Sequence, residues 1–357
     1  MHGTEIENST TEFKDELINK NVKNFKEIVT PLELIEKYPL SKKVQMHITN
    51  TRQSIQNIMN KRDKRKLLIV GPCSIHNVDE AKEYANNLLL LSNEVSDKIL
   101  IIMRVYFEKP RTINGWKGLI NDPDLNETYN IDKGLNMARE LLVYLADIGL
   151  PAAYEMLDTF TPQYISDLIS WSAVGARTTE SQVHRQLVSG LSMPVGFKNS
   201  THGDCKIALD AIKSANQKHC FYGITYEGKA AMITTNGNEN CHIILRGSNE
   251  GPNYYKNNIN DLKILMKQNN IKTPIMIDCS HGNSSKDYKN QSSVWNYIIE
   301  NYLEEENIIG YMLESNLKEG NQKLNNPDNL EYGVSITDSC ISFAETCKLV
   351  LFLYGKL

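Results

Sequence analysis

The most restrictive feature of the chain is a repeated alternation of short apolar, β-branched segments with longer stretches of helical spacing, which begins near Leu67. Strand candidates lie at 67–72, 99–106, 151–156, 173–177, 195–199, 242–246, 275–278 and 308–313. Helix candidates lie between them at 79–91, 132–146, 162–170, 182–189, 206–214, 260–266 and 293–304, with a last helix at about 338–354. Such alternation is typical of a parallel sheet with crossover helices. Eight units predict an α/β fold, a (β/α)8 TIM barrel; a doubly wound open sheet is the alternative, although no G-x-G-x-x-G follows the first strand.

Two additions interrupt the predicted barrel. Residues 1–66 form an N-terminal extension, in which Thr30-Pro31 is typical of a helix start and 44–59 has helical spacing. Residues 67–357 form the barrel, with an inserted β-hairpin at about 219–236. The stretch 108–130 is rich in Gly, Asn, Asp and Pro and is expected to be a long loop, which is either functional or disordered.

Charge and cysteine usage exclude several classes of protein. The chain has 39 Lys+Arg against 43 Asp+Glu, which argues against bulk binding to nucleic acid or to membrane surfaces. Its apolar runs are too short to span a bilayer. The seven cysteines are scattered and form no C-x-x-C pair, and the polar start contains no apolar signal core. We therefore expect free thiols and a cytoplasmic location.

Nearly every predicted strand ends in a charged or metal-competent side chain. In a TIM barrel these ends meet at one rim, where catalytic groups lie. The basic members are Arg104, Lys109, Arg111, Arg177, Lys198 and Arg246. Each one alone is most often a solvated loop residue, but together on one rim they would repel each other strongly. Their joint placement indicates ligands with several negative charges, such as phosphates and carboxylates.

A second group at the same rim offers one sulfur, one imidazole and two carboxylates: Cys73, His281, Glu314 and Asp338. This mixture suits Mn²⁺, Fe²⁺, Co²⁺ or Zn²⁺ better than Ca²⁺ or Mg²⁺. The four residues lie far apart in sequence, so spacing does not identify a metal site. From the residues alone, Cys73 acting as a nucleophile with His281 as its base is an equal alternative.

Several segments resemble those of one enzyme family. They include G-P-C-S-I-H at 71–76, R-V-Y-F-E-K-P-R-T at 104–112, G-W-K-G-L-I-N-D-P at 115–123, G-A-R-T-T-E-S-Q at 175–182, P-V-G-F-K-N at 194–199, H-I-I-L-R-G at 242–247, S-H-G-N-S-S-K at 280–286, E-S-N at 314–316, E-G-N-Q at 319–322 and S-I-T-D at 335–338. These segments run in the order of the type I, microbial metal-dependent 3-deoxy-D-arabino-heptulosonate 7-phosphate (DAHP) synthases, and the chain resembles that family. The resemblance runs from about residue 20 to the C-terminus.

This resemblance implies a reaction and a set of site residues. The reaction condenses phosphoenolpyruvate with erythrose 4-phosphate and water, releases phosphate, and opens the shikimate route to aromatic amino acids. By matching positions, the metal ligands are Cys73, His281, Glu314 and Asp338, which decides for metal over nucleophile. The phosphoenolpyruvate site comprises Arg104, Lys109, Arg177, Lys198 and Arg246, with Glu155 as a polar partner. Arg111 and Thr112 match the binders of the erythrose phosphate, and Lys109 is expected to donate a proton to the forming alkoxide or to position both substrates.

The extension and the hairpin match family elements that build a feedback site for an aromatic amino acid and support a homodimer or homotetramer. By resemblance the effector pocket contains Pro162, Gln163, Leu191, Ser192, Phe221 and Gly223. Gly223 predicts tyrosine as the effector, because glycine leaves room for the tyrosine hydroxyl where phenylalanine-sensitive members have serine. The alternative is that Gly223 serves a strand bulge.

Two other functions remain open at this point. A 3-deoxy-manno-octulosonate 8-phosphate synthase would share the barrel but accept a pentose phosphate, and the K-P-R-T motif with the N-terminal extension argues against it. An inactive, ligand-sensing barrel is the other alternative, and the complete set of metal and phosphate groups argues against it. Ser248 departs from the family pattern, which commonly has a second glycine there, but removes no chemical group.

Overall fold

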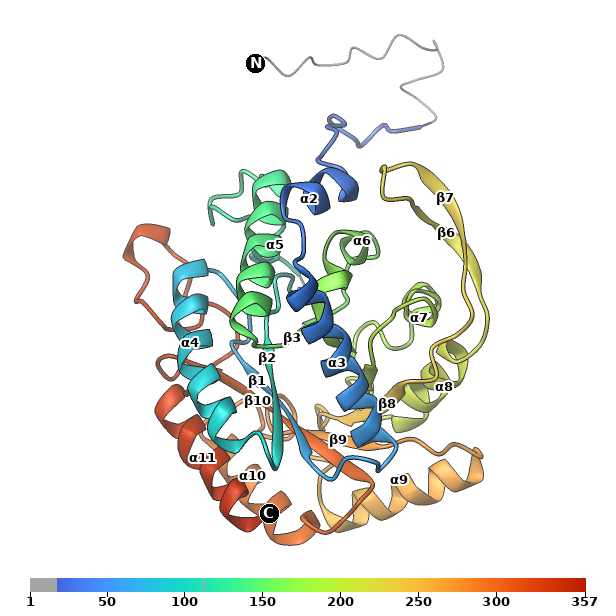
Figure 1. Ribbon diagram of the computed structural model, residues 1–357, viewed down its shortest axis with the longest axis vertical. Helices are drawn as coiled ribbons and strands as arrows, with labels where there is room; N and C mark the ends of the chain where they lie inside the picture. Colours follow the sequence, from blue (N-terminus) through green and yellow to red (C-terminus); the bar gives the residue numbers. More distant parts are fainter. Residues whose placement is uncertain (1–17, 112) are drawn as a thin grey trace.

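The computed structural model describes residues 18–111 and 113–357 and contains a closed parallel barrel surrounded by helices (Figure 1). The sheet runs in the order β1-β2-β3-β4-β5-β8-β9-β10, and pairing of β1 with β10 closes it. The barrel strands are β1 (Lys66–Gly71), β2 (Ile99–Arg104), β3 (Ala152–Glu155), β4 (Ile169–Val174), β5 (Val195–Lys198), β8 (Cys241–Leu245), β9 (Ile275–Asp278) and β10 (Ile308–Asn316). The predicted TIM barrel is therefore confirmed.

Helices connect successive strands and cover the outside of the barrel. They are α4 (Val78–Val95), α5 (Ile131–Ile148), α6 (Thr161–Ile165) with the 3-10 turn η1 (Ser166–Leu168), α7 (Gln182–Ser189), α8 (Cys205–Ala215), α9 (Lys256–Gln268), α10 (Asn290–Tyr302) and α11 (Phe343–Lys356), with a short 3-10 turn η2 (Pro327–Asn329) before α11. Most of these helices turn an apolar face toward the sheet and a polar face outward, which is the pattern that predicted them.

The barrel strands bury both of their faces. Leu67 and Ile69 of β1 belong to the core inside the barrel, whereas Leu68 and Val70 pack in the layer between strands and helices. Ile55 of α3 (Lys42–Met59) joins the inner core, so α3 covers the N-terminal end of the barrel. The C-terminal end is thereby left for binding and chemistry.

The N-terminal extension and the inserted hairpin meet on one side of the molecule (Figure 1). Helix α2 (Pro31–Lys37) begins at a capping box formed by Thr30 and Glu33. The hairpin consists of β6 (Cys220–Ile224) and β7 (Ala230–Thr234). The backbone N–H of Leu32 donates at 2.8 Å to the carbonyl of Tyr226, which lies in the turn between β6 and β7. Both predicted additions to the barrel are confirmed.

Several predicted boundaries differ from the structure, and two of these errors concern how the chain reaches the barrel rim. The fourth strand begins at Ile169 rather than at residue 173, because Ser170 and Ser172 are buried strand residues and not part of the preceding helix. The last helix begins at Phe343 rather than at Asp338. Before it, the short strand β11 (Ile341–Ser342) pairs with β10, which leaves Asp338 in a loop at the barrel rim.

The described residues contain no helix that is long and apolar enough to cross a membrane. All seven cysteines are free thiols. The free thiols agree with the sequence prediction.

Candidate active site

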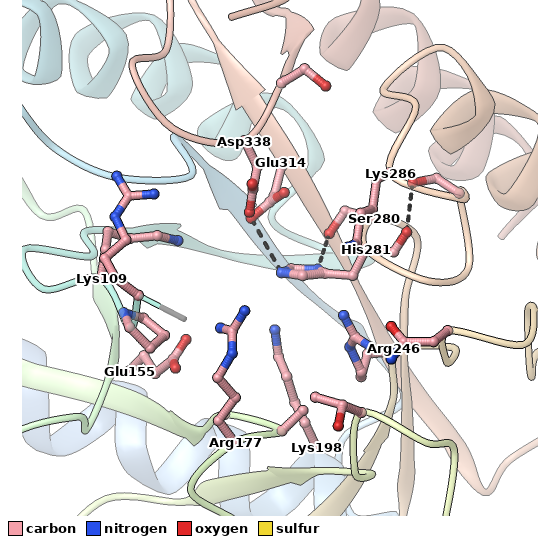
Figure 2. Close-up of a pocket in the computed structure, with 18 of the residues that line it drawn as sticks. Lys109, Glu155, Arg177, Lys198, Arg246, Ser280, His281, Lys286, Glu314 and Asp338 are labelled. Carbon is pink, nitrogen blue, oxygen red and sulfur yellow. Dashed lines mark hydrogen bonds and ion pairs between the residues drawn. The ribbon is translucent and has the colours of Figure 1, made fainter. Parts of the chain in front are cut away.

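A cavity of about 590 Å³ opens at the C-terminal ends of the barrel strands. The predicted site residues that line it are Lys109, Arg111, Glu155, Arg177, Lys198, Arg246, His281, Glu314 and Asp338. Figure 2 shows Arg177 and Lys198 reaching toward His281 and the two acids across the cavity. Arg104 and Cys73 lie buried next to these residues. Thr112 lies outside the described residues.

The long loop after β2 delivers Lys109 and Arg111 to this cavity. The backbone N–H of Lys109 donates to the carbonyl of Lys117 at 2.8 Å, and Arg111 Nε donates to the carbonyl of Trp116 at 2.8 Å. The loop folds back so closely that a Cβ at Gly118 would lie 2.0 Å from the carbonyl oxygen of Phe107. Gly118 also has a φ of +115°, so glycine is required on both counts.

Three candidate metal ligands lie together at the C-terminal end of the barrel. The ligand atoms of Cys73, Glu314 and Asp338 all lie within 4.8 Å of one another. His281 approaches the same group, with Nε2 3.7 Å from Glu314 Oε1. A thiol and two carboxylates that lie together, with an imidazole beside one of them, match the donor set of a divalent transition-metal ion, so the residues present fit the predicted metal.

Backbone and side-chain contacts hold these ligands in place. Gln291, fully buried in α10, donates to the carbonyl of Glu314 at 3.0 Å and accepts from its N–H at 2.9 Å. Thr337 Oγ1 lies 2.7 Å from Ser74 Oγ, which ties the loop carrying Asp338 to the loop carrying Cys73. The candidate ligands therefore come from separate strand ends and loops but are fixed relative to one another.

The charge of the site favours a bound cation. Burial and the neighbouring Glu314 raise the pKa of the Cys73 thiol to about 11. A bound metal ion would offset both effects and stabilise the thiolate, so binding is expected to release a proton. Lys109 Nζ lies 3.1 Å from Cys73 Sγ. Burial opposes the charge of Lys109, but Cys73 and Glu314 outweigh it and raise its pKa.

The basic side chains form the opposite part of the site. Arg104 is fully buried, and its Nη2 donates to Glu314 Oε1 at 2.9 Å. Its guanidinium lies 4.1 Å from the ring centre of Tyr106, and Nη1 has no hydrogen-bond acceptor among the described residues. Burial lowers the pKa of Arg246, and Arg177 acts in the same direction. Arg104, Lys198 and Arg246 are buried, whereas Arg177 is exposed, and such a group of cations is what an anion-binding site requires.

A second cavity, of about 200 Å³, lies between α6, α7 and the hairpin. All six predicted effector residues line it: Pro162, Gln163, Leu191, Ser192, Phe221 and Gly223. Gly223 pairs in regular antiparallel register with Ala231, so it does not serve a bulge. A Cβ at Gly223 would lie 2.2 Å from Ile233 Cδ1.

Some residues of the active-site cavity were not predicted. Asp278 ends β9 and forms ion pairs with Lys198 and His281, while Lys286 lines the cavity as a further cation. The sequence signal for Asp278 was present, because it is an acid at a strand end three residues before His281. Tyr106 under Arg104 carried no comparable signal.

Fold and site together define a TIM-barrel enzyme with a metal-competent centre beside an anion-binding wall. A family model described as "DAHP synthetase I family" matches residues 41–350. The chain therefore belongs to the DAHP synthetase I family, and the predicted DAHP synthase enzyme class is confirmed.

Individual relatives agree with this assignment. The chain is 49% identical over 330 residues to the Phe-sensitive phospho-2-dehydro-3-deoxyheptonate aldolase of Escherichia coli K12, covering 92% of this chain and 94% of the relative. It is 47% identical over 346 residues to the Tyr-sensitive enzyme of the same strain, covering 96% and 97%. A solved phospho-2-dehydro-3-deoxyheptonate aldolase from Francisella tularensis SCHU S4 superimposes with a TM-score of 0.92 at 49% identity, covering 94% of this chain and 98% of that one.

Proposed function

We propose that this chain catalyses the metal-dependent condensation of phosphoenolpyruvate with D-erythrose 4-phosphate and water to give DAHP and phosphate. The observation that carries the proposal is that three ligand-competent groups, Cys73, Glu314 and Asp338, lie beside a set of basic side chains at one cavity. We call this set the basic wall; it consists of Arg104, Lys109, Arg177, Lys198 and Arg246. The family membership supports the same reaction. An inactive sensing barrel is disfavoured because every charged group that the chemistry needs is in place.

The metal would be held by Cys73, His281, Glu314 and Asp338, and the donor set suits Mn²⁺, Fe²⁺, Co²⁺ or Zn²⁺. When bound there, a divalent ion supplies Lewis-acid polarisation of the aldehyde oxygen of erythrose 4-phosphate.

The chain's own residues would bind and orient the substrates. Arg104, Lys109, Arg177, Lys198 and Arg246 supply the positive charge for the phosphate and carboxylate of phosphoenolpyruvate. Arg111 and Thr112 are proposed to bind the erythrose phosphate, and Glu155 is the polar partner in the phosphoenolpyruvate site.

The proposed bond changes balance as follows. The methylene carbon of phosphoenolpyruvate attacks the aldehyde carbon, and water adds to the resulting cationic C2 with release of one proton, which can restore the proton that Lys109 gives up. The C2–O bond to phosphate then breaks as the C2 hydroxyl becomes the ketone, and the proton of that hydroxyl leaves with the phosphate. Lys109 Nζ, 3.1 Å from Cys73 Sγ, is placed to donate a proton to the aldehyde oxygen as it becomes an alkoxide.

We also propose that tyrosine inhibits the enzyme by binding in the second cavity. Its volume of about 200 Å³ and its mixed lining of Pro162, Gln163 and Phe221 suit an aromatic amino acid.

The N-terminal extension, residues 1–66, is the proposed regulatory and oligomerisation arm beside the catalytic barrel, residues 67–357. Exposed apolar side chains on arm and hairpin, such as Phe25, Tyr222 and Met232, support a homodimer or homotetramer, which light scattering would distinguish. The free cysteines support a reducing, cytoplasmic setting.

The reaction is tested by following the ultraviolet absorbance of phosphoenolpyruvate in the presence of erythrose 4-phosphate, before and after treatment with a chelator. We expect consumption that stops on metal removal and returns when Mn²⁺ is added. Consumption that continues without any bound metal would contradict the metal role, and no consumption under any condition would contradict the enzyme.

A further inference from the structure

A buried carboxylate lies between the candidate metal centre and the basic wall. Asp278 is the last residue of β9, and its side chain has no solvent exposure. Its Oδ2 lies 3.0 Å from His281 Nδ1 and 3.1 Å from Lys198 Nζ. Its Oδ1 accepts from Ser280 twice, from the hydroxyl at 2.6 Å and from the backbone N–H at 3.0 Å. Oδ1 is therefore hydrogen-bonded to Ser280, and Oδ2 lies at ion-pair distance from the other two residues.

The contacts of Ser280 determine which nitrogen of His281 carries the proton. Ser280 Oγ lies 2.6 Å from His281 Nδ1 as well as from Asp278 Oδ1. A hydroxyl has one proton to donate, and a carboxylate only accepts, so that proton is directed to Asp278. The Ser280 oxygen and Asp278 Oδ2 therefore both face His281 Nδ1 as acceptors. Nδ1 must carry hydrogen, and Nε2, which faces Glu314, keeps its lone pair for a metal (Figure 2).

The same carboxylate fixes the position of Lys198. Lys198 ends β5 and is nearly fully buried, and Asp278 is the acid with which it forms an ion pair among the described residues. Such a pair offsets part of the cost of burying the ammonium group.

We infer that Asp278 is a positioning residue that serves both ligands at once: it orients His281 for the metal and holds the Lys198 ammonium in place for phosphoenolpyruvate. This inference rests on the metal and phosphoenolpyruvate sites proposed above. If Asp278 had only a structural role, its replacement would lower the stability of the protein. The positioning role predicts instead that the binding constants for the metal and for phosphoenolpyruvate both weaken in a protein that is still folded.

The test is Asp278→Asn, which preserves shape and removes the charge. Metal affinity is measured on metal-free protein by titration with Co²⁺, followed through the thiolate-to-cobalt absorption and by competition with a chromogenic chelator. Phosphoenolpyruvate affinity is measured separately by calorimetry on metal-free protein. We expect metal affinity to fall about 10- to 100-fold, as for partners of other metal-ligating histidines, and phosphoenolpyruvate affinity to fall about tenfold. Circular dichroism establishes that the variant is folded.

Two further variants make the result decisive. Asp210→Asn removes an exposed carboxylate that pairs with Lys206 on α8 and should leave both affinities unchanged. Ser280→Ala keeps the Asp278–Lys198 pair, so it should weaken Co²⁺ binding and leave phosphoenolpyruvate binding intact; it also tests the inference if Asp278→Asn does not fold.

Several outcomes would overturn the inference. A folded Asp278→Asn protein that retains either affinity within twofold contradicts the double role, and so does Ser280→Ala with unchanged Co²⁺ binding. If the wild-type protein itself binds neither Co²⁺ nor phosphoenolpyruvate, the proposed function fails, and the inference fails with it.

Discussion

Replacing Gly175 by alanine should impair the enzyme without unfolding it. Gly175 follows β4 at the rim, and a Cβ there would lie 2.3 Å from Glu155 Oε1 and 3.1 Å from its Cδ. Ordinary van der Waals contact begins at 3.4 Å, so the Glu155 carboxylate must recede by about 1 Å. Gly175 has no positive φ, and the obstructing atom is the end of a flexible side chain, so the fold should tolerate the change.

The catalytic cost follows from this displacement. A misplacement of about 1 Å in a catalytic site costs on the order of 100-fold in rate, which corresponds to about 2.7 kcal/mol in the activation free energy. Initial rates of phosphoenolpyruvate consumption over a range of concentrations give kcat/KM for Gly175→Ala and wild type. The matched control is Gly355→Ala in α11, where a new Cβ meets nothing within 4 Å.

A double-mutant cycle identifies the cause. If alanine at 175 acts through Glu155, then adding it to Glu155→Ala should change kcat/KM no further. The reasoning is refuted if Gly175→Ala retains activity within threefold of wild type, or if its effect persists undiminished in the Glu155→Ala background.

Three other predictions test the metal, the effector and a buried acid. Cys73→Ser should weaken Mn²⁺ binding on the order of tenfold or more in chelator competition, with activity lost in parallel; full activity at unchanged metal affinity would contradict the ligand role. Gly223→Ser should raise the tyrosine concentration for half-inhibition and lower that for phenylalanine, and an unchanged ratio would count against the effector assignment. Burial raises the pKa of Glu108 from 4.5 to about 7. The folded state then binds the extra proton, so the free energy of unfolding should fall by about 3 kcal/mol as pH rises from 4.5 to 7. Urea unfolding at several pH values gives the change in the free energy of unfolding with pH, which should be smaller for Glu108→Gln than for the wild type. An equal change in both proteins would refute the role of Glu108.

The barrel was predictable because its signal is local. Each strand is a short apolar run that buries both faces, and each helix carries its own periodicity. The start of β4 was missed because Ser170 and Ser172 interrupt its apolar pattern. Ser172 Oγ donates to the carbonyl of Tyr154 at 2.9 Å, a contact with a neighbouring strand that no local pattern contains.

The location of the site was also predictable, since parallel strands bring their ends to one rim. What could not be predicted is how side chains turn there. Asp338 was placed in a helix, and only the pairing of β11 with β10 puts it beside Glu314. Asp278 was passed over because its importance depends on which way Lys198 and His281 point, and sequence spacing contains no such information.

The claim that the enzyme condenses phosphoenolpyruvate with erythrose 4-phosphate is tested most directly by measuring substrates and products with each of two sugar-phosphate acceptors. The purified enzyme with Mn²⁺ is given phosphoenolpyruvate and either erythrose 4-phosphate or arabinose 5-phosphate, and consumed phosphoenolpyruvate and released phosphate are quantified together. The account predicts equal consumption and release with erythrose 4-phosphate, a seven-carbon product by mass spectrometry, and little turnover of the pentose. Preference for arabinose 5-phosphate, or phosphate released without a condensation product, would contradict it.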